Sequence, residues 1–155
     1  MSTATSTDRI EKTVILHAPQ ARVWRAIADA EEFGTWFRVR LESAFAEGAT
    51  VRGRITYPGY EHLKWEATVQ KIEPERLFSF TWPQSKSLDS PDYTNAPTTL
   101  VEFRLEKTLT GTLLTLTESG FDKLPPDWRL DAFRRNDGGW TEQMKNIEKH
   151  VAAKP

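Results

Sequence analysis

The side chain in this sequence best placed to do chemistry is the carboxylate of Glu118. It follows Leu114 and Leu116 at alternate positions of the stretch TLLTLTES (112–119), so in an extended strand all three share one face. A carboxylate on an apolar face is costly to bury unless it is hydrogen-bonded or protonated, and burial raises its pKa. Glu118 is therefore a candidate anchor for a ligand, or a general acid or base. The alternative is a structural carboxylate that accepts hydrogen bonds from a loop or from Arg134 or Arg135.

The other polar side chains are weaker candidates for a functional role than Glu118. The Tyr57 hydroxyl is placed either to orient a ligand or to reach solvent at a strand end. His62 comes next to the Pro58-Gly59-Tyr60 turn, where we expect it exposed, and no serine or aspartate is placed to complete a triad with it. The sequence has no cysteine, and its three histidines lack the spacing of metal ligands. We assign no catalytic residue, no metal site and no cofactor.

The elements that must position these residues follow from the spacing of apolar side chains. Residues 9–17 alternate and predict a strand, after which Pro19 begins a predicted helix over 19–28 and a second short helix covers 31–37. The spacing then changes to a period of two and predicts six strands, at 41–45, 51–57, 62–72, 77–82, 98–105 and 113–118. Tight turns join most of them, so we expect an antiparallel meander.

A long helix is predicted from about Pro125-Pro126-Asp127 to the C-terminus. Its apolar stripe consists of Phe133, Trp140, Met144, Ile147 and Val151. Gly138 and Gly139 weaken it by about 1 kcal/mol each relative to alanine. The stripe keeps its phase across the glycines, so we expect one helix, in which they let another backbone approach or let the helix flex over a cavity. The alternative is that they end one helix and begin another.

Together these elements predict an α+β fold of the helix-grip type. A curved seven-stranded antiparallel sheet wraps a long C-terminal helix, with two short helices after the first strand, and the sheet and helix enclose a hollow. At 155 residues the chain is predicted to form one domain, over 9–152, preceded by a disordered tail at 1–8. Residues 83–97 form a long polar loop that either closes over an opening, with Tyr93 as its cover, or has no role.

The charges of the chain nearly cancel, with 21 basic and 22 acidic residues and no stretch rich in lysine and arginine. Nucleic acid is therefore not an expected partner. No apolar run approaches the ~20 residues that span a bilayer, and the N-terminus lacks the apolar segment of a signal peptide. We expect a cytoplasmic protein with no membrane span.

Four stretches resemble a known superfamily: HAPQARVWRAIADAEEFGTWF at 17–37, VQKIEPERLFSFTW at 69–82, TLLTLTESGF at 112–121 and NDGGW at 136–140. They are similar to START-like (SRPBCC) proteins, within them to the C-terminal domain of heat-shock-chaperone ATPase activators. The resemblance implies the helix-grip fold. Its implied functions are broad, because relatives include lipid and sterol carriers, polyketide cyclases and chaperone regulators. The resemblance implies a further N-terminal domain in the activators, which we do not expect in this chain.

The six tryptophans, eight phenylalanines and three tyrosines either fill a core or line an apolar cavity. Strand alternation, the helical stripe and, for Trp36, the resemblance give these candidate ligand-binding residues: Trp36, Tyr57, Trp65, Phe80, Trp82, Phe103, Glu118, Phe133 and Trp140. The leading function is non-enzymatic binding of a small lipophilic or aromatic molecule between the sheet and the helix. The alternatives are a cyclase- or hydrolase-like enzyme that uses Glu118 as acid or base, and a protein-interaction module resembling a chaperone ATPase activator, with a protein partner that the sequence does not identify.

Overall fold

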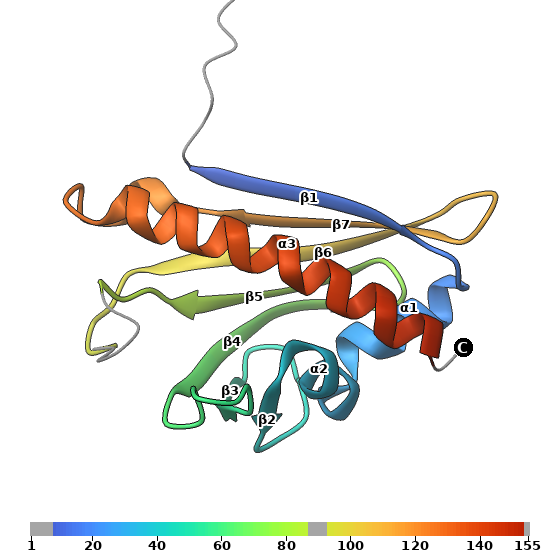
Figure 1. The fold of residues 1–155 in the computed structure, drawn as a ribbon, viewed down its shortest axis with the longest axis horizontal. Helices are drawn as coiled ribbons and strands as arrows, with labels where there is room; N and C mark the ends of the chain where they lie inside the picture. Colours follow the sequence, from blue (N-terminus) through green and yellow to red (C-terminus); the bar gives the residue numbers. More distant parts are fainter. Residues whose placement is uncertain (1–7, 87–92, 154–155) are drawn as a thin grey trace, which may run out of the picture.

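A curved antiparallel sheet of seven strands, in the order β1-β7-β6-β5-β4-β3-β2, forms the frame of the protein (Figure 1). The computed structural model describes residues 8–86 and 93–153. Along the chain the elements are β1 (Arg9–Leu16), α1 (Gln20–Ala28), α2 (Ala30–Phe37), β2 (Val39–Leu41), β3 (Thr50–Ile55), β4 (Lys64–Glu73), β5 (Leu77–Pro83), β6 (Thr98–Lys107), β7 (Thr112–Ser119), the 3-10 turn η1 (Phe121–Lys123) and α3 (Arg129–Ala153).

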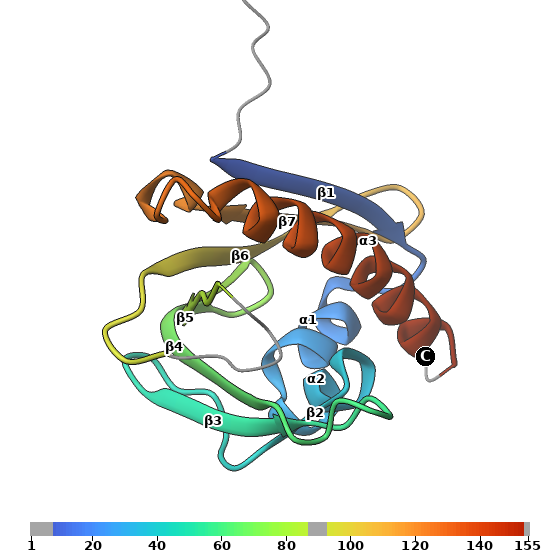
Figure 2. The same cartoon turned by 60° about the vertical axis from the view of Figure 1, so that its left-hand side comes forward.

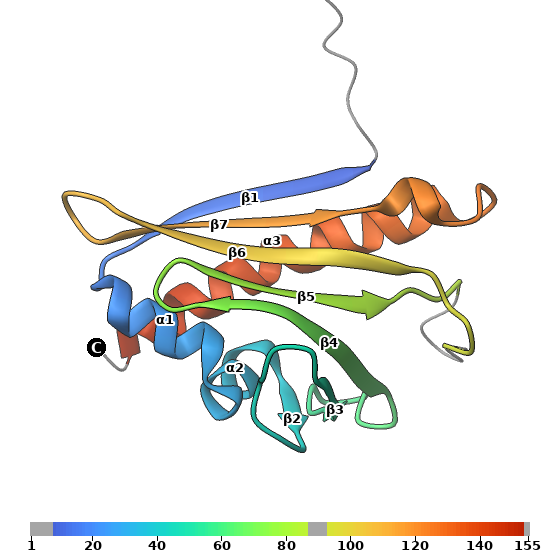
Figure 3. The ribbon, with the colours of Figure 1, turned by 180° about the vertical axis from the view of Figure 1, so that it is seen from behind.

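The predicted fold class is confirmed. One face of the sheet is covered by α3, which lies behind β5, β6 and β7 when the molecule is seen from the other side (Figure 3). Helices α1 and α2 lie between the C-terminal end of α3 and strand β2 (Figure 2). The prediction of one helix across Gly138 and Gly139 is also confirmed, since α3 is continuous from Arg129 to Ala153. No helix among the described residues is long and apolar enough to cross a membrane.

The predicted bounds of the second strand, 41–45, are wrong, since β2 covers Val39–Leu41. Arg38 ends α2 in the left-handed conformation, with a φ of 70°, and the chain enters β2 directly at Val39. Beyond Leu41 the chain leaves the sheet, and Phe45 packs from the loop against Phe33 and Phe78, with ring centroids 5.4 and 4.8 Å apart. Phe45 has the spacing of a strand residue, but it packs into the core from a loop. The predicted tail at 1–8 lies, except for residue 8, outside the described residues.

The concave side of the sheet is filled with aromatic rings where α2 packs on it. Phe33 of α2 lies 6.4 Å, centroid to centroid, from both Phe80 and Phe103, and all three side chains are fully buried. Trp36 is buried beside them and donates its indole N–H to the carbonyl oxygen of Ala26 at 2.8 Å. This part of the predicted hollow is solid.

The C-terminal half of α3 packs against this solid region. Met144, Ile147 and Val151 are buried on the face that the apolar stripe predicted. The side chain of His150 lies 2.9 Å from the Glu32 carboxylate of α2, which also accepts hydrogen bonds from Arg22 and Arg25 of α1. These contacts hold the end of α3 to both short helices.

Candidate ligand-binding site

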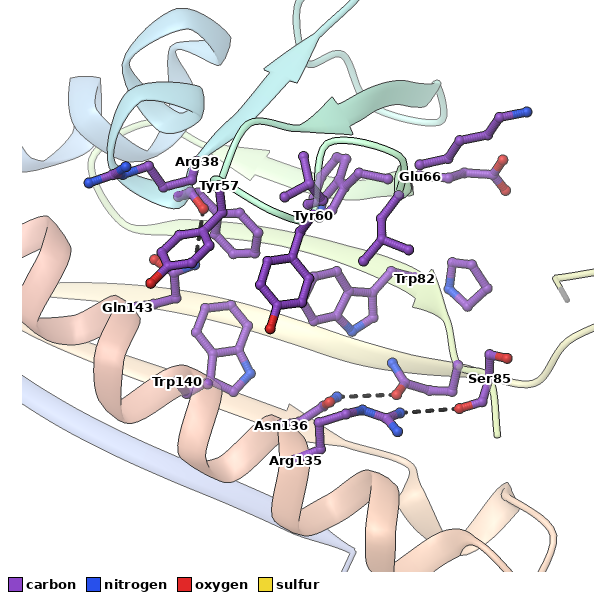
Figure 4. Close-up of a pocket in the computed structure, with 18 of the residues that line it drawn as sticks. Arg38, Tyr57, Tyr60, Glu66, Trp82, Ser85, Arg135, Asn136, Trp140 and Gln143 are labelled. Atoms are coloured by element: carbon purple, nitrogen blue, oxygen red, sulfur yellow. Dashed lines mark hydrogen bonds between the residues drawn. The ribbon is translucent and has the colours of Figure 1, made fainter. Parts of the chain in front are cut away.

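A pocket of about 420 Å³ opens between the middle of α3, residues 135–146, and the edge of the sheet formed by β3, β4 and the end of β5 (Figure 4). It lies where α2 no longer fills the space under the sheet, with only the last residue of that helix, Phe37, on its wall. Its lining residues are Phe37, Arg38, Ile55, Tyr57, Tyr60, Leu63, Lys64, Trp65, Glu66, Trp82, Pro83, Gln84, Ser85, Tyr93, Arg135, Asn136, Gly139, Trp140, Glu142, Gln143 and Asn146.

Aromatic side chains make up much of this wall. Trp82 of β5 and Trp140 of α3 lie 5.7 Å apart between ring centroids, and Trp65 of β4 lies 6.2 Å from Trp82. Tyr57 and Tyr60, from the connection between β3 and β4, are about half exposed and point toward α3 (Figure 4). Such a wall offers apolar contact area on rings of limited conformational freedom, as ligand pockets commonly do.

Glu118 lies behind this wall and ties its two halves together. Its Oε2 atom accepts hydrogen bonds from the Trp82 indole at 2.7 Å and the Thr99 hydroxyl at 2.6 Å. Its Oε1 atom accepts from the Trp140 indole at 2.8 Å, and Asn136 Nδ2 lies within 3.2 Å of both oxygens. A single carboxylate therefore fixes the ring planes of Trp82 from the sheet and Trp140 from the helix.

The protonation of Glu118 is set by two opposing effects. Burial raises the pKa of this carboxyl, and the hydrogen bonds from Thr99, Trp82, Trp140 and Asn136 only partly oppose the rise. The nitrogen atoms of the two indoles and the amide can only donate, so they fit an ionised carboxylate better than a carboxyl. The arrangement is that of a buried structural anion surrounded by neutral donors.

The structure divides the candidate residues into two groups. Tyr57, Trp65, Trp82 and Trp140 lie on the pocket wall, whereas Trp36, Phe80, Phe103, Glu118 and Phe133 do not. Phe133 packs instead on Phe121, with ring centroids 5.2 Å apart. His62 is exposed, as predicted.

Several wall residues were not predicted. Arg135, Asn136 and Gln143 lie beside the apolar stripe of α3. The helical periodicity predicted only the apolar positions of this helix as wall residues. Arg135 was considered as a donor to Glu118, but its guanidinium donates to the carbonyl oxygen of Ser85 at 3.2 Å. The donors to Glu118 come instead from β5, β6 and α3. Spacing within one strand cannot identify partners so distant in the sequence.

No backbone of the described residues packs against the glycine pair of α3. A Cβ atom built on Gly138 or Gly139 meets nothing within 4 Å. The expectation that the glycines admit a second backbone is therefore wrong. Gly139 lies on the pocket wall and Gly138 does not, so the missing side chain at 139 adds room to the pocket.

The long loop contributes its two ends to the pocket. Gln84 and Ser85 are buried at the end of β5, and Tyr93 is half-buried on the wall. Burial raises the pKa of the Tyr93 hydroxyl, Glu66 raises it further, and the positive charge of Arg135 opposes the rise. The lid predicted at 83–97 lies in part, at 87–92, outside the described residues.

Two buried polar atoms have no hydrogen-bond partner among the described residues: the Trp65 indole nitrogen and the Thr108 hydroxyl. Within the same part of the chain, no group of three or more histidine, aspartate or glutamate side chains is placed to hold a metal ion.

The chain belongs to the family described as Activator of Hsp90 ATPase homolog 1-like protein, whose family model matches residues 17–152. The resemblance to the START-like (SRPBCC) superfamily is thereby confirmed. No curated protein matches the chain.

Solved structures of similar fold come from several bacteria. Protein MLL2253 of Mesorhizobium loti is 22% identical with a TM-score of 0.75, over 95% of this chain and 98% of that one. A protein of Arthrobacter aurescens is 14% identical with a TM-score of 0.78, over 98% and 91% of the two chains. Protein NE0264 of Nitrosomonas europaea is 15% identical with a TM-score of 0.73, over 99% and 100%. At these identities the likeness establishes the fold.

Proposed function

We propose that the protein binds a small molecule with an apolar, aromatic body in the pocket between α3 and the β3–β5 edge, without transforming it. The observation that carries this proposal is the aromatic-walled pocket of about 420 Å³ beside the closely packed rings around Phe33. This volume falls within the ~300–1,000 Å³ common for small-molecule sites. Removal of apolar ligand surface from water at about 25 cal/mol per Å² supplies the driving force.

The wall is held in place before a ligand arrives. Glu118 fixes Trp82 and Trp140 by charge-assisted hydrogen bonds, and Gln143 donates to the carbonyl oxygen of Phe37 at 3.1 Å, which ties α3 to the end of α2. A preformed wall lowers the ordering cost of binding. The same contacts argue against acid–base catalysis by Glu118, because both oxygens are occupied and the side chain is fully buried behind the wall.

The proposal is tested with N-phenyl-1-naphthylamine, a neutral aromatic probe whose fluorescence rises in apolar surroundings. We expect saturable binding to the wild type and to Gly138→Leu, and at least about tenfold weaker binding to Gly139→Leu, whose side chain would enter the pocket. Both substitutions replace an exposed helix glycine, so they form a matched pair. Absence of saturable binding to the wild type, or equal affinity in the two variants, would contradict the proposal.

A second candidate function follows from the family match over 17–152, whose description names activation of the Hsp90 ATPase. In that case the chain would contact the chaperone through its surface, with no requirement for the pocket. The test is the ATPase rate of Hsp90 with and without this protein. Stimulation that persists in Gly139→Leu would support this candidate, and no change in rate together with no salt-resistant complex would exclude it.

A further inference from the structure

We infer that the molecule bound in the pocket carries a negatively charged group, and that Arg135 binds it. The inference rests on the proposed function, because it assigns the chemical class of the ligand that fills the same pocket. Three observations carry it: the charge balance of the wall, the burial of Arg135, and the position of Arg135 at one end of the pocket.

The cations of the pocket wall are unpaired, whereas its acids are paired elsewhere. Among the described residues, no carboxylate lies within ion-pairing distance of Arg38, Lys64 or Arg135. Both acidic residues on the wall already have cationic partners outside it. Glu66 pairs with Arg52 at 3.4 Å, and Glu142 pairs with Lys145 at 3.1 Å. The wall therefore carries three cations against two acids, and no acid among the described residues forms an ion pair with these cations.

Of the three cations, Arg135 is the one that has lost solvation. Its side chain is half-buried, and burial lowers the pKa of its guanidinium, which the nearby Glu118 and Asp131 carboxyls oppose. By contrast, Lys64 is exposed. Arg38 is also exposed, and its guanidinium lies over the Tyr57 ring, 5.9 Å from the centroid. A partly desolvated cation is the one that gains most from an anion.

The hydrogen-bonding capacity of Arg135 is mostly unused. Its guanidinium has five N–H donors, and within the described part of the chain it makes one hydrogen bond, from Nη2 to the carbonyl oxygen of Ser85 at 3.2 Å. The Glu118 carboxylate nearby is not a substitute partner, because Trp82, Thr99, Trp140 and Asn136 occupy both its oxygens. Donors remain for a carboxylate, sulfonate or phosphate oxygen of a ligand.

The position of Arg135 gives the ligand a direction. Arg135 and Asn136 lie at the end of the pocket next to Ser85, whereas Tyr57, Arg38 and Gln143 lie at the other end (Figure 4). The tryptophan faces of the wall lie between the two ends. A ligand with its acidic group at Arg135 and an aromatic body along Trp82 and Trp140 matches both the charge and the apolar surface of the pocket.

The test compares two probes that differ by one charged group: 8-anilinonaphthalene-1-sulfonate and its neutral parent, N-phenyl-1-naphthylamine. We expect Arg135→Met to weaken sulfonate binding at least about tenfold, the usual loss for a hydrogen-bonded charge, and to change neutral-probe affinity less than threefold. Arg135→Lys should retain part of the sulfonate affinity. Arg134→Met removes the neighbouring exposed cation of α3, which does not line the pocket, and serves as the matched control, with a change of threefold or less.

A salt titration of the wild type gives a second measurement that needs no variant. Sodium chloride should weaken sulfonate binding and leave neutral-probe binding unchanged, because it screens only the charge pair. If the neutral probe binds and Arg135→Met alters both probes equally or neither, the inference is wrong while the proposed function stands. If neither probe binds the wild type saturably, the proposed function fails and the inference fails with it. Circular dichroism confirms that each variant is folded.

Discussion

The two halves of α3 are both held by a glutamate, but by glutamates of opposite chemistry. The N-terminal half carries Asn136 and Trp140 of the pocket wall and is held through them to Glu118, whose donors are all neutral. The C-terminal half lies on solid core and is held through His150 to Glu32, whose other donors are Arg22 and Arg25.

The pKa values of the two carboxyls move in opposite directions. Burial raises the pKa of Glu118, and neutral donors do not fully compensate. Burial also raises that of Glu32, but the hydrogen bonds from His150, Arg25 and Arg22 outweigh it and leave the pKa lowered. The neutral donors to Glu118 hold the pocket wall in place without adding a second cation beside Arg135. At the solid end, Glu32 is held by cationic donors instead.

The largest effect should follow from Glu118→Gln. A carboxamide offers one oxygen, so in either orientation its NH₂ group faces the indole N–H of Trp82 or Trp140, and a buried donor loses its acceptor. We expect a loss of about 3 kcal/mol in the free energy of unfolding, measured by urea denaturation. The control is Glu11→Gln, an exposed residue whose change should cost less than about 0.5 kcal/mol. A loss below 1 kcal/mol at Glu118 would show that the pocket wall does not depend on this network.

A smaller effect is expected from Glu32→Gln at the solid end. The substitution removes the charge that Arg22, Arg25 and His150 share, but Glu32 remains 23% exposed on its side chain and Arg25 57%, so solvent screens part of the interaction. We expect a loss of about 1–2 kcal/mol at neutral pH, reduced at 1 M NaCl. A loss that salt leaves unchanged would contradict the assignment of this end to charge pairing.

The pH dependence of the two variants should have opposite signs. Because the folded pKa of Glu32 is lowered from 4.5, its contribution is complete above that value and is lost as the pH falls through the folded pKa. The difference between wild type and Glu32→Gln should therefore shrink below about pH 4.5. The folded pKa of Glu118 is raised, so the folded chain binds a proton at this carboxyl more tightly than the unfolded chain does. The free energy of unfolding of the wild type should therefore increase relative to that of Glu118→Gln as the pH falls toward 4.5. Urea titrations from about pH 3 to pH 8 measure both trends, and trends of the same sign would contradict the comparison.

The sequence predicted the helices, the strands and the inner face of the sheet better than it predicted which inner side chains line the pocket and which lie in the core. Alternation placed Trp65, Phe80, Trp82 and Phe103 on the inner face of the sheet, and all four are there. It could not show that Phe33 of α2 covers Phe80 and Phe103, which leaves only the two tryptophans on the pocket wall. Depth depends on which side chains of other elements fill the space, and that is a property of tertiary packing.

The polar residues of the site could not be predicted because their contacts also depend on how separate elements pack. Glu118 was found because a charge on an apolar face is anomalous within its own strand. Its donors, at positions 82, 99, 136 and 140, are ordinary residues in their own elements and become a network only when β5, β6 and α3 meet β7. Arg135, beside the apolar stripe of α3, is likewise an ordinary helix residue until its burial and its unpaired charge are seen.

The smallest effect, and the sharpest division between stability and function, is expected at the glycine pair in the pocket half of α3. Gly138→Ala and Gly139→Ala should each raise the free energy of unfolding by about 0.5–1 kcal/mol, because alanine is a better helix former and its Cβ meets nothing within 4 Å at either position. Only the methyl group at 139 enters the pocket, so only Gly139→Ala should weaken probe binding, by a few-fold where leucine gives tenfold or more. Thermal melting and fluorescence titration of the two variants measure both quantities on the same samples. If both alanines stabilise the helix and neither alters binding, the glycines have no role in the pocket, and the gap at 139 is not part of the ligand's space.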